Sequence, residues 1–548
     1  MTNNSVRPAI AAAVDFGTYG SGFAYTHLND PSGEVFVFEE WPSSPATYIK
    51  TRSALLLEDE APLAWGYAAR LALERPTSPS SHLRYVTDFK LGLLAQPEAE
   101  RREAVTYVTH YLRLLRLFAL ERIRVSFAVD DGAVKWTLTV PAIWSDANRA
   151  AMRTAALDAG FHASLALATE PEVAAIFCLQ RTTLLNKPPA PGARVLVVDA
   201  GGGTVDLTAF EIAKGGRLRQ FSAESGDTVG STFLDAGFRE ALRTRLSADA
   251  LLDLNQAEPA DAARLADDWE RAKRNWDGGP LSFGFSGRML RLLEKHHADE
   301  LRLLSSSQDG VDDALVLTAN EVKEIFDRVV EPVLELVDEQ IAAIAGAAQA
   351  YVFLVGGFAQ SPYLQARLRS QLAGGPSLII PPNPASAVLL GAAMYAARPG
   401  IVETRKARLT YGVATAMSFD RRLDPLENFF LDWAGKPKCR DRFDIFARLG
   451  DNIPPGRLVK HVFLPTAEGQ TEVALAIYAT EARNPRYVTE DDCVFLAEVV
   501  VELGRATSVP MRKRDVELSL TFGDVDIAVT ARVKATGETL DTVLRFPW

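Results

Sequence analysis

The sequence predicts an α/β protein with two similar lobes, followed by a β-rich C-terminal domain. Three observations support this prediction. Strand-like and helix-like patterns alternate until the segment Arg398-Pro399-Gly400, after which short alternating strands dominate. A glycine-rich hairpin at residues 13–25 recurs at residues 197–210, which indicates a duplicated unit. Finally, 548 residues are too many for one compact core.

The first lobe is expected over residues 1–190. We expect strands at residues 10–15, 22–28, 35–39 and 136–140, and helices at residues 100–123 and 145–160. Ser145 and Gly160 suit the two ends of the second of these helices, as N-cap and C′ residues. The proline-rich stretch 186–192 leads out of this lobe.

The second lobe is expected over residues 191–397. Thr318 and Glu321 have the spacing of a capping box ahead of a long helix. Pro332 lies inside that pattern and predicts a kink or a break. A strand at residues 351–355 precedes a glycine pair and a further helix.

The C-terminal domain is expected over residues 398–548. Strand patterns occur at residues 471–482, 493–503, 514–522, 525–534 and 539–546. The turn Gly523-Asp524 separates two runs of alternating apolar residues. No helical segment follows the last strand pattern, so no helical lid is expected.

The overall composition excludes some functions. The net charge of −11 argues against sequence-independent nucleic-acid binding, which needs a basic surface. Three widely spaced cysteines show no zinc-like spacing and suit a reducing compartment. The longest apolar window, residues 341–359, changes from helical to strand periodicity, so we expect no membrane span. We therefore expect a cytoplasmic protein of unspecified oligomeric state.

Each repeated hairpin has an aspartate at the end of its first strand, Asp15 or Asp199, followed by a glycine-rich turn. An ordinary tight turn would explain either hairpin alone. Consecutive glycines, however, also let backbone N–H groups surround phosphate oxygens. A strand-end carboxylate suits a hydrated magnesium ion. Two such hairpins together favour a cleft that binds phosphate and magnesium.

Several segments carry a family resemblance. These are AVDFGT (13–18), LTVPAIWSDANRAAM (138–152), ATEPEVAAI (168–176), VLVVDAGGGTVDL (195–207), WERAKRNW (269–276), and YVFLVGGFAQSPYLQ (351–365) with NPASAVLLGAAMYA (383–396). In this order they resemble the ATPase domain of seventy-kilodalton heat-shock proteins, the DnaK-type chaperones, within the actin and hexokinase superfamily. Residues 516–546 resemble the last strands of the chaperones' peptide-binding domain, and RLTYGV (408–413) is typical of a divergent, atypical branch.

The resemblance implies a two-lobed, actin-like (ribonuclease H-like) ATPase domain that holds ATP or ADP with Mg²⁺, and a C-terminal domain like a lidless substrate-binding domain. Asp15 and Asp199 would hold the metal. Lys90, Glu170, Thr204 and Asp206 would serve hydrolysis. The nucleotide would contact Asp15, Gly17, Thr18, Tyr19, Gly201, Gly202, Gly203, Thr204, Gly230, Glu270, Lys273, Arg274, Gly356 and Gly357.

The chain also departs from the family pattern. Gln360 stands where the chaperones usually have an adenine-stacking arginine, and Ala385 where they have an aspartate. The linker 398–407 lacks the usual leucine-rich character. The expected function is that of an ATP-binding, slowly ATP-hydrolysing chaperone whose C-terminal domain takes unfolded peptide. The alternatives are an ATP-binding adaptor that does not cycle, and an actin-like filament protein.

Overall fold

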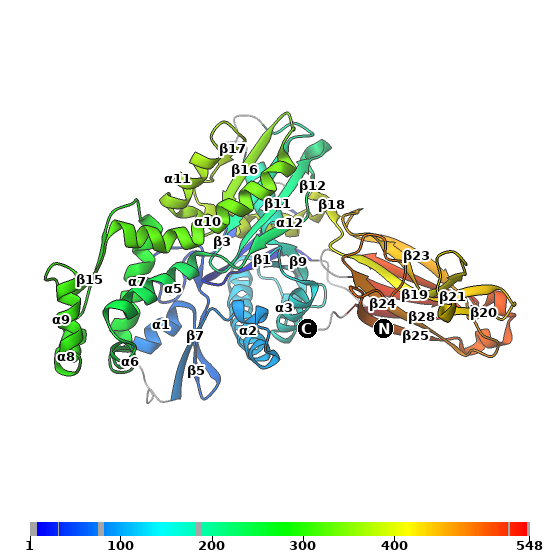
Figure 1. The fold of residues 1–548 in the computed structure, drawn as a ribbon, viewed down its shortest axis with the longest axis horizontal. Helices are drawn as coiled ribbons and strands as arrows, with labels where there is room; N and C mark the ends of the chain where they lie inside the picture. The colour runs from blue at the N-terminus through cyan, green and yellow to red at the C-terminus, as the bar shows by residue number, and fades with distance from the viewer. Residues whose placement is uncertain (1–7, 31, 75–81, 182–187, 524–526, 545–548) are drawn as a thin grey trace. The chain divides into compact units, whose positions relative to one another are not determined.

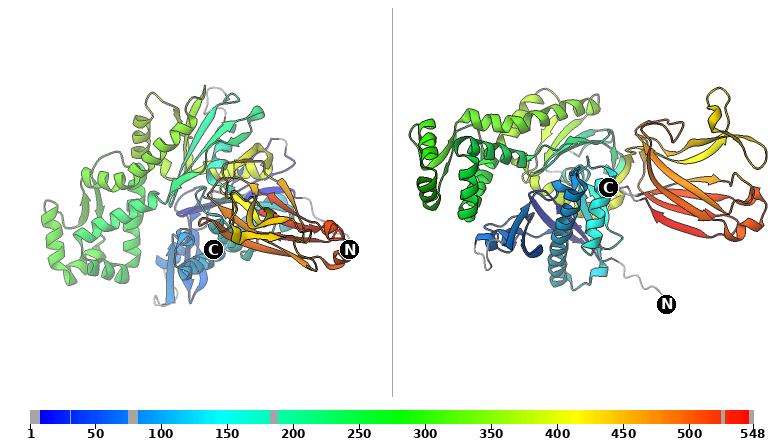
Figure 2. Two further views of the ribbon diagram at one scale, coloured as in Figure 1. Left: turned by 45° about the vertical axis from the view of Figure 1, so that its right-hand side comes forward. Right: turned by 60° about the horizontal axis from the view of Figure 1, so that its bottom comes forward.

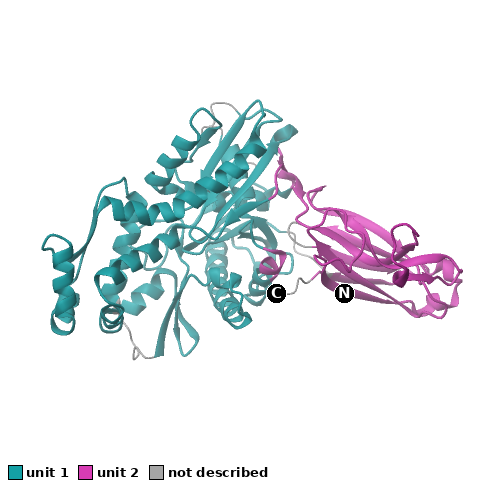
Figure 3. Ribbon diagram, viewed as in Figure 1, with its two compact units in different colours: residues 1–144, 151–216, 224–399 teal, residues 145–150, 217–223, 400–548 magenta. Residues whose placement is uncertain are grey.

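The structure is a computed structural model that describes residues 8–30, 32–74, 82–181, 188–523 and 527–544. The chain divides into two compact units (Figure 3). Unit 1 contains residues 1–144, 151–216 and 224–399, and unit 2 contains residues 145–150, 217–223 and 400–548. Asp524 of the predicted turn and the start of the proline-rich stretch lie outside the described residues.

The first lobe of unit 1 is built on a mixed sheet with the strand order β3-β2-β1-β8-β9, and β4 pairs with β2. The strands are β1 (Ile10–Phe16), β2 (Gly20–His27), β3 (Phe36–Val37), β4 (Thr51–Arg52), β8 (Val134–Val140) and β9 (Ala166–Thr169). β1 is antiparallel to β2 and parallel to β8. All of β1 is buried, which explains its unbroken apolar run.

The second lobe repeats this plan with the strand order β17-β16-β10-β11, and β13 pairs with β11. The strands are β10 (Arg194–Ala200), β11 (Val205–Ile212), β13 (Ser225–Asp227), β16 (Ala350–Val355) and β17 (Ser377–Ile379). β10 is antiparallel to β11 and parallel to β16. The two-lobed α/β fold predicted from the repeated hairpin is therefore confirmed.

Two buried helices lie between the sheets, α4 (Glu170–Gln180) and α12 (Ala387–Ala397). They pack on each other at Gly391, where an added Cβ atom would lie 1.8 Å from the carbonyl oxygen of Val173. Only glycine allows this approach. The contact fixes α4, whose first residue, Glu170, is a predicted site residue.

Further helices pack around the two sheets or extend outward from the second lobe (Figure 1). They include α1 (Gly66–Glu74), α2 (Glu98–Phe127), α3 (Asp146–Asp158), α5 (Ser231–Arg245), α6 (Ala248–Ala257), α7 (Pro259–Asn275), α8 (Gly287–His296), α9 (Ala298–Ser307), α10 (Ala319–Ile344) and α11 (Pro362–Gln371). Smaller sheets contain β5 (Ala54–Glu58), β6 (Ala61–Trp65) and β7 (Leu83–Thr87), and β14 (Leu281–Gly284) with β15 (Ala314–Leu317). In the described part of the chain, no helix combines the length and apolar character needed to cross a bilayer.

The long helix α10 begins as its sequence predicts. Thr318 and Glu321 form the capping box, each side chain accepting a backbone N–H of the other residue. Of the two predicted effects of Pro332, the break is wrong, because α10 continues through this residue, and the kink stays a prediction. The neighbouring Val329 and Val333 are buried, and α10 packs on β10 and β11 (Figure 1). Tertiary packing therefore outweighs the hydrogen bond that proline removes.

Unit 2 is a sandwich of two antiparallel sheets, whose strands form two layers in Figure 2. One sheet has the order β20-β21-β19-β24-β25, and the other β23-β26-β27-β28. The strands are β19 (Thr410–Ser418), β20 (Phe429–Leu431), β21 (Pro437–Ala447), β23 (Arg457–Phe463), β24 (Glu472–Thr480), β25 (Val494–Glu502), β26 (Val516–Phe522), β27 (Ile527–Val533) and β28 (Thr539–Val543). Unit 2 also contains β12 (Leu218–Gln220), β18 (Val402–Lys406) and β22 (Asn452–Ile453).

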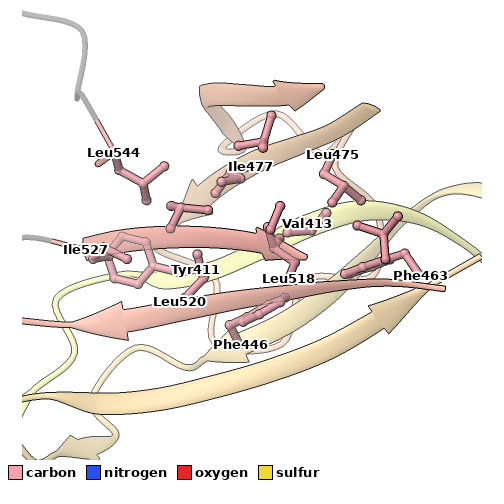
Figure 4. Close-up of a cluster of buried hydrophobic side chains, with 14 of the residues drawn as sticks. Tyr411, Val413, Phe446, Phe463, Leu475, Ile477, Leu518, Leu520, Ile527 and Leu544 are labelled. Atoms are coloured by element: carbon pink, nitrogen blue, oxygen red, sulfur yellow. The ribbon is translucent and has the colours of Figure 1, made fainter. Parts of the chain in front are cut away.

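Apolar side chains from both sheets meet inside the sandwich (Figure 4). Val413 and Ile477 come from the first sheet, and Leu518 and Leu520 from the second, and all four are fully buried. The alternation seen in the sequence therefore separates core from surface, as in a packed pair of sheets. This confirms the predicted β-rich C-terminal domain.

One buried ion cluster lies at the end of this domain. Asp424 is fully buried, and Arg442 and Arg486 approach its carboxylate at 3.2 and 2.7 Å. Tyr487 Oη also donates to Asp424 Oδ1 at 2.7 Å. Burial opposes ionisation, yet the hydrogen bonds from the Asp420 backbone, Tyr487 and Arg486 outweigh it and lower the pKa of Asp424 to about 2.

Candidate nucleotide-binding site

The two glycine-rich turns face each other across the lobes. A Cβ atom added to Gly203 would lie 2.5 Å from Thr18 Oγ1, and one added to Gly202 would lie 3.5 Å from the backbone nitrogen of Tyr19. Residues 17–19 and 201–204 therefore form two sides of one concavity. The duplicated hairpins predicted a two-walled cleft, and the fold places both walls together.

The N-terminus of α5 holds the second turn in place. The backbone N–H and hydroxyl of Thr232 donate to Gly202 O at 2.9 and 2.8 Å, and Ser231 N donates to Gly201 O at 3.2 Å. A Cβ atom on Gly230 would lie 2.3 Å from Gly202 O. Gly230 therefore allows the helix to approach the loop. The positive end of the helix dipole lies beside the turn and favours an anion there.

A cavity of about 100 Å³ lies between these turns. Its lining includes these predicted residues: Asp15, Gly17, Thr18, Tyr19, Lys90, Glu170, Asp199, Gly201, Gly202, Gly203, Thr204, Glu270, Lys273, Arg274, Gly356 and Gly357. Two predicted residues, Asp206 and Gly230, do not line it. Asp206 lies behind it as the register partner of Asp199, and Gly230 supports Gly202.

Lys90 and Glu170 form a buried ion pair, with Nζ 2.8 Å from Oε1. Burial raises the pKa of Glu170 to about 7, although the ammonium of Lys90 favours its charged form. A carboxyl group that titrates near neutral pH can take or give a proton during a reaction. The ammonium of Lys90 also places a positive charge at a fixed position inside the cavity.

Two aspartates of the second hairpin lie close to this pair. Asp206 is buried, and its Oδ1 accepts the backbone N–H of Ile143 at 2.9 Å. Its Oδ2 is buried without a hydrogen-bond partner among the described residues. Burial, together with Glu170 and Asp206, raises the pKa of Asp199 well above its ordinary value. Several buried carboxyl groups are therefore crowded together in this part of the site, and each one favours the protonated form of its neighbours.

The charged face of α7 forms an ordered network at the other end. Lys273 Nζ lies 2.6 Å from both Glu270 and Asp235, and it donates to Ser231 O at 3.1 Å. Arg274 Nε donates to Glu270 Oε1 at 2.8 Å. The predicted Glu270, Lys273 and Arg274 therefore lie together, as the helix spacing of three and four residues implies.

Tyr19 lies between these cations. Its ring is within 4.5 Å of the Arg52 guanidinium carbon and 5.5 Å of that of Arg274. Burial, followed by the charge of Glu270, raises its pKa well above the ordinary value. Arg52 also forms an ion pair with Asp267 of α7 at 2.6 Å, which links the two lobes. The sequence contains no motif that marks Arg52 as part of the site.

Lys50 is a second residue that the sequence hypothesis missed. Its Nζ lies 2.7 Å from Asp15 Oδ2, while Thr139 Oγ1 donates to Asp15 Oδ1 at 3.3 Å. Asp15 Oδ2 therefore has an ion-pair contact and Oδ1 a hydrogen bond. Lys50 is one lysine in the segment YIKTR, with no recognisable spacing to other site residues.

Most of this chain is similar to known proteins. A family model described as Hsp70 protein matches residues 124–406, which is just over half of the chain. The chain belongs to the Hsp70 family. Human heat shock 70 kDa protein 12B is 26% identical over 98% of this chain and 91% of its own length. Human heat shock 70 kDa protein 12A is 25% identical over the same shares. The chaperone protein DnaK of Anaplasma marginale (strain St. Maries) is 26% identical over 77% of this chain and 58% of its own.

The Hsp70 family binds ATP and ADP, normally with Mg²⁺, so the fit of a metal to this Hsp70 chain can be tested. Among the described residues, no group of three or more His, Cys, Asp or Glu side chains is arranged to hold one. Asp15 is already paired with Lys50 and Thr139. Asp199 lines the cavity among these crowded carboxyl groups and has no Lys or Arg ion pair among the described residues. A cation would therefore be held from Asp199, whereas Asp15 would have to give up its pair with Lys50 to help hold one. Asp15 as a metal ligand stays a prediction.

Two departures from the Hsp70 pattern line the same cavity, Gln360 at the end of a 3₁₀ turn (Phe358–Gln360) and Ala385. Gly356, at φ +93°, lets the chain turn past Asp199, because a Cβ atom there would lie 2.5 Å from Asp199 Oδ1. A larger cavity of about 410 Å³ shares Tyr19, Arg52 and Glu270 with the first. It also shares Thr18, but none of the glycines of the two turns line it, so the smaller cavity is the one suited to phosphate.

Proposed function

We propose that this Hsp70-family protein binds ATP and ADP between its two lobes and hydrolyses ATP slowly. The observation that carries the proposal is the convergence of two glycine-rich turns on the Lys90–Glu170 ion pair. Two concave turns suit a phosphate chain, and a fixed cation offsets the charge that develops during phosphoryl transfer. Neither feature alone would distinguish a nucleotide site from a structural turn.

The phosphates would lie between residues 17–19 and 201–204, where the backbone N–H groups and the hydroxyls of Thr18 and Thr204 are donors. The N-terminus of α5 beside Gly202 adds a favourable dipole. Lys90 would supply positive charge to the terminal phosphate. Magnesium bound with the nucleotide at Asp199 would supply further positive charge against the phosphates.

Asp206 and Glu170 are the candidates for handling the proton of the attacking water. Asp206 has one buried oxygen without a partner among the described residues, so it can accept a hydrogen bond from water. Glu170, with a pKa of about 7, can exchange a proton near neutral pH. In this proposal Asp206 orients the water and Glu170 balances the charge of Lys90.

Nucleotide entry requires the lobes to move apart. The cavity of about 100 Å³ is smaller than the several hundred Å³ that a ligand of nucleotide size occupies. Arg52 and Asp267 close the lobes against each other at 2.6 Å. We infer a hinge motion of the kind that two-lobed enzymes use to enclose ligands.

Asp206→Asn tests the hydrolysis mechanism. Asparagine keeps an oxygen for the Ile143 N–H, so the fold should persist while the charge is lost. We expect single-turnover ATP hydrolysis to fall about 100-fold or more, with nucleotide affinity changed by less than about threefold. The matched control is Asp227→Asn, an exposed aspartate on β13 that likewise accepts a backbone N–H, from Thr228.

An unchanged hydrolysis rate in Asp206→Asn contradicts the mechanism. Tight ATP binding by the wild-type chain with no hydrolysis would favour the adaptor alternative. ATP-dependent sedimentation into polymers would favour the filament alternative. Absence of nucleotide binding in every condition refutes the proposed function as a whole.

We further propose that the β domain binds an extended peptide along an edge strand. β25 is at one edge of its sheet and exposes Val494, Phe495 and Val500. An edge strand offers unpaired backbone groups, and exposed apolar side chains provide pockets for alternate peptide residues. Phe495→Glu should weaken binding of a labelled apolar peptide about tenfold in fluorescence anisotropy, whereas the same change at the exposed Leu303 of α9 should not. Equal affinity in all three proteins contradicts this site.

A further inference from the structure

Lys50 contacts Asp15, one of the two strand-end aspartates of the described site. The proposed hydrolysis gives Lys50 no role. Its Nζ is 2.7 Å from Asp15 Oδ2, and the two side chains are only 17% and 3% exposed. Lys50 lines the same cavity as both glycine-rich turns. A lysine in this position needs space for its aliphatic chain to reach the carboxylate. It also needs an electrostatic role that offsets the burial of its charge.

Glycines of the first hairpin leave the space through which the Lys50 side chain reaches Asp15. Lys50 directly precedes β4, which pairs with β2 so that Arg52 lies opposite Gly20. A Cβ atom on Gly20 would lie 3.5 Å from Lys50 Cβ, and one on Gly22 would lie 3.4 Å from Lys50 Cγ. Gly22 is also the register partner of Asp15. The aliphatic stem therefore crosses the hairpin where side chains are absent, and its ammonium reaches the aspartate.

The distribution of charged groups around the cavity explains why a lysine is placed beside Asp15. Four buried carboxylates lie at or just behind the cavity, namely Asp15, Glu170, Asp199 and Asp206. Each carboxylate of the first lobe has its own lysine: Glu170 has Lys90 and Asp15 has Lys50. Within the described residues, the two aspartates of the second lobe have no lysine or arginine ion pair. The positive charges that balance the two carboxylates of the first lobe are therefore supplied by the protein itself, from Lys50 and Lys90.

We propose that Lys50 is a built-in cation for the nucleotide phosphates and replaces the metal at Asp15, so that nucleotide binding depends only weakly on magnesium. The inference rests on the proposed nucleotide site. A lysine ammonium has three N–H donors, and the contact with Asp15 leaves others for phosphate oxygens. Charge-assisted hydrogen bonds of this kind are the strong ones in proteins.

The test is calorimetric titration of the full chain with ADP, once in excess Mg²⁺ and once in EDTA. For the wild type we expect dissociation constants within about tenfold of each other. For Lys50→Met we expect the ratio of the two constants to grow by at least about tenfold, the value of one charge-assisted hydrogen bond. Lys214→Met, at an exposed lysine outside the site, should match the wild type.

The outcomes separate this inference from the proposed function. ADP binding by the wild type that is tight in Mg²⁺ and lost in EDTA overturns the role of Lys50 and leaves the nucleotide site intact. So does an unchanged ratio in Lys50→Met. No binding in either buffer refutes the nucleotide site itself.

Lys50→Met leaves the buried carboxylate of Asp15 without its ion-pair partner, which can unfold the protein. A second variant therefore tests the proposal without an unpaired buried charge. The double variant Asp15→Asn/Lys50→Met removes both charges and leaves no unpaired ion. It should fold, as circular dichroism would show, and should depend on magnesium as strongly as the single variant. A double variant with the wild-type ratio overturns the proposal.

Discussion

Replacing Lys90 by methionine is the sharpest test of the charge balance in the site. The Nζ and Oε1 atoms of the Lys90–Glu170 pair are 2.8 Å apart. With an effective dielectric constant of about 20, two unit charges at this separation attract by about 6 kcal/mol, or about four factors of ten in a proton equilibrium. Removing Lys90 therefore keeps Glu170 protonated throughout the neutral range.

This protonation limits the loss of stability. A stranded buried carboxylate would cost about 3–5 kcal/mol. A neutral Glu170 that has lost one hydrogen bond should cost only about 1–3 kcal/mol in urea unfolding. The variant is therefore expected to fold at pH 7.5. Lys323→Met, which breaks an exposed ion pair with Asp327 on α10, is the matched control and should leave stability unchanged.

The assay is single-turnover ATP hydrolysis between pH 6 and 8.5. In the wild type the rate should rise with pH around 7, because Glu170 loses its proton there. In Lys90→Met we expect no such rise, and at pH 7.5 a rate at least about 100-fold lower. A folded, nucleotide-binding variant with a wild-type profile would refute the reasoning, because Lys90 would then not set the protonation of Glu170.

Two further predictions concern the fold. Gly391→Ala should lower the free energy of unfolding of unit 1 by about 1–3 kcal/mol, because its Cβ would lie 1.8 Å from Val173 O; helix propensity alone predicts a gain of about 1 kcal/mol, so a more stable variant contradicts the packing. Asp424→Asn should lower the melting temperature of unit 2, because Arg442 and Arg486 lose a buried partner. The folded-state pKa of Asp424, about 2, is below its unfolded value, so its stabilisation is present above about pH 4 and should be lost as the pH falls toward 2; a melting temperature independent of pH in this range contradicts it.

Much of the fold follows from local patterns. The capping box at Thr318, the unbroken apolar runs before Asp15 and Asp199, and the alternation in β26 and β27 depend on neighbours a few residues apart. Such patterns reflect hydrogen-bond geometry and side-chain period, so they can be recognised in the sequence. Pro332 shows the limit, because local chemistry predicts a kink or a break there, and packing on the second sheet keeps α10 continuous.

The site divides in the same way. The glycine-rich turns and the strand-end aspartates were identifiable because each hairpin carries its residues within a short segment. Lys90, Glu170 and α7 are distant from these hairpins in the sequence, and only the resemblance to the Hsp70 family connected them to the site. The fold brings all of these residues to one cavity. Their roles in hydrolysis stay predictions until the variants are measured.

The sequence by itself determined that this protein has two glycine-rich hairpins on duplicated lobes and a β-rich third part, because these depend on residue period and turn chemistry. Only the tertiary structure decided which charges meet. Lys50 and Asp15 are far apart in sequence, and they pair because β4 joins β2 beside two glycines that leave room for the lysine. The strength of an electrostatic interaction depends on the distance between the charges in space. The sequence around a single lysine does not indicate that distance.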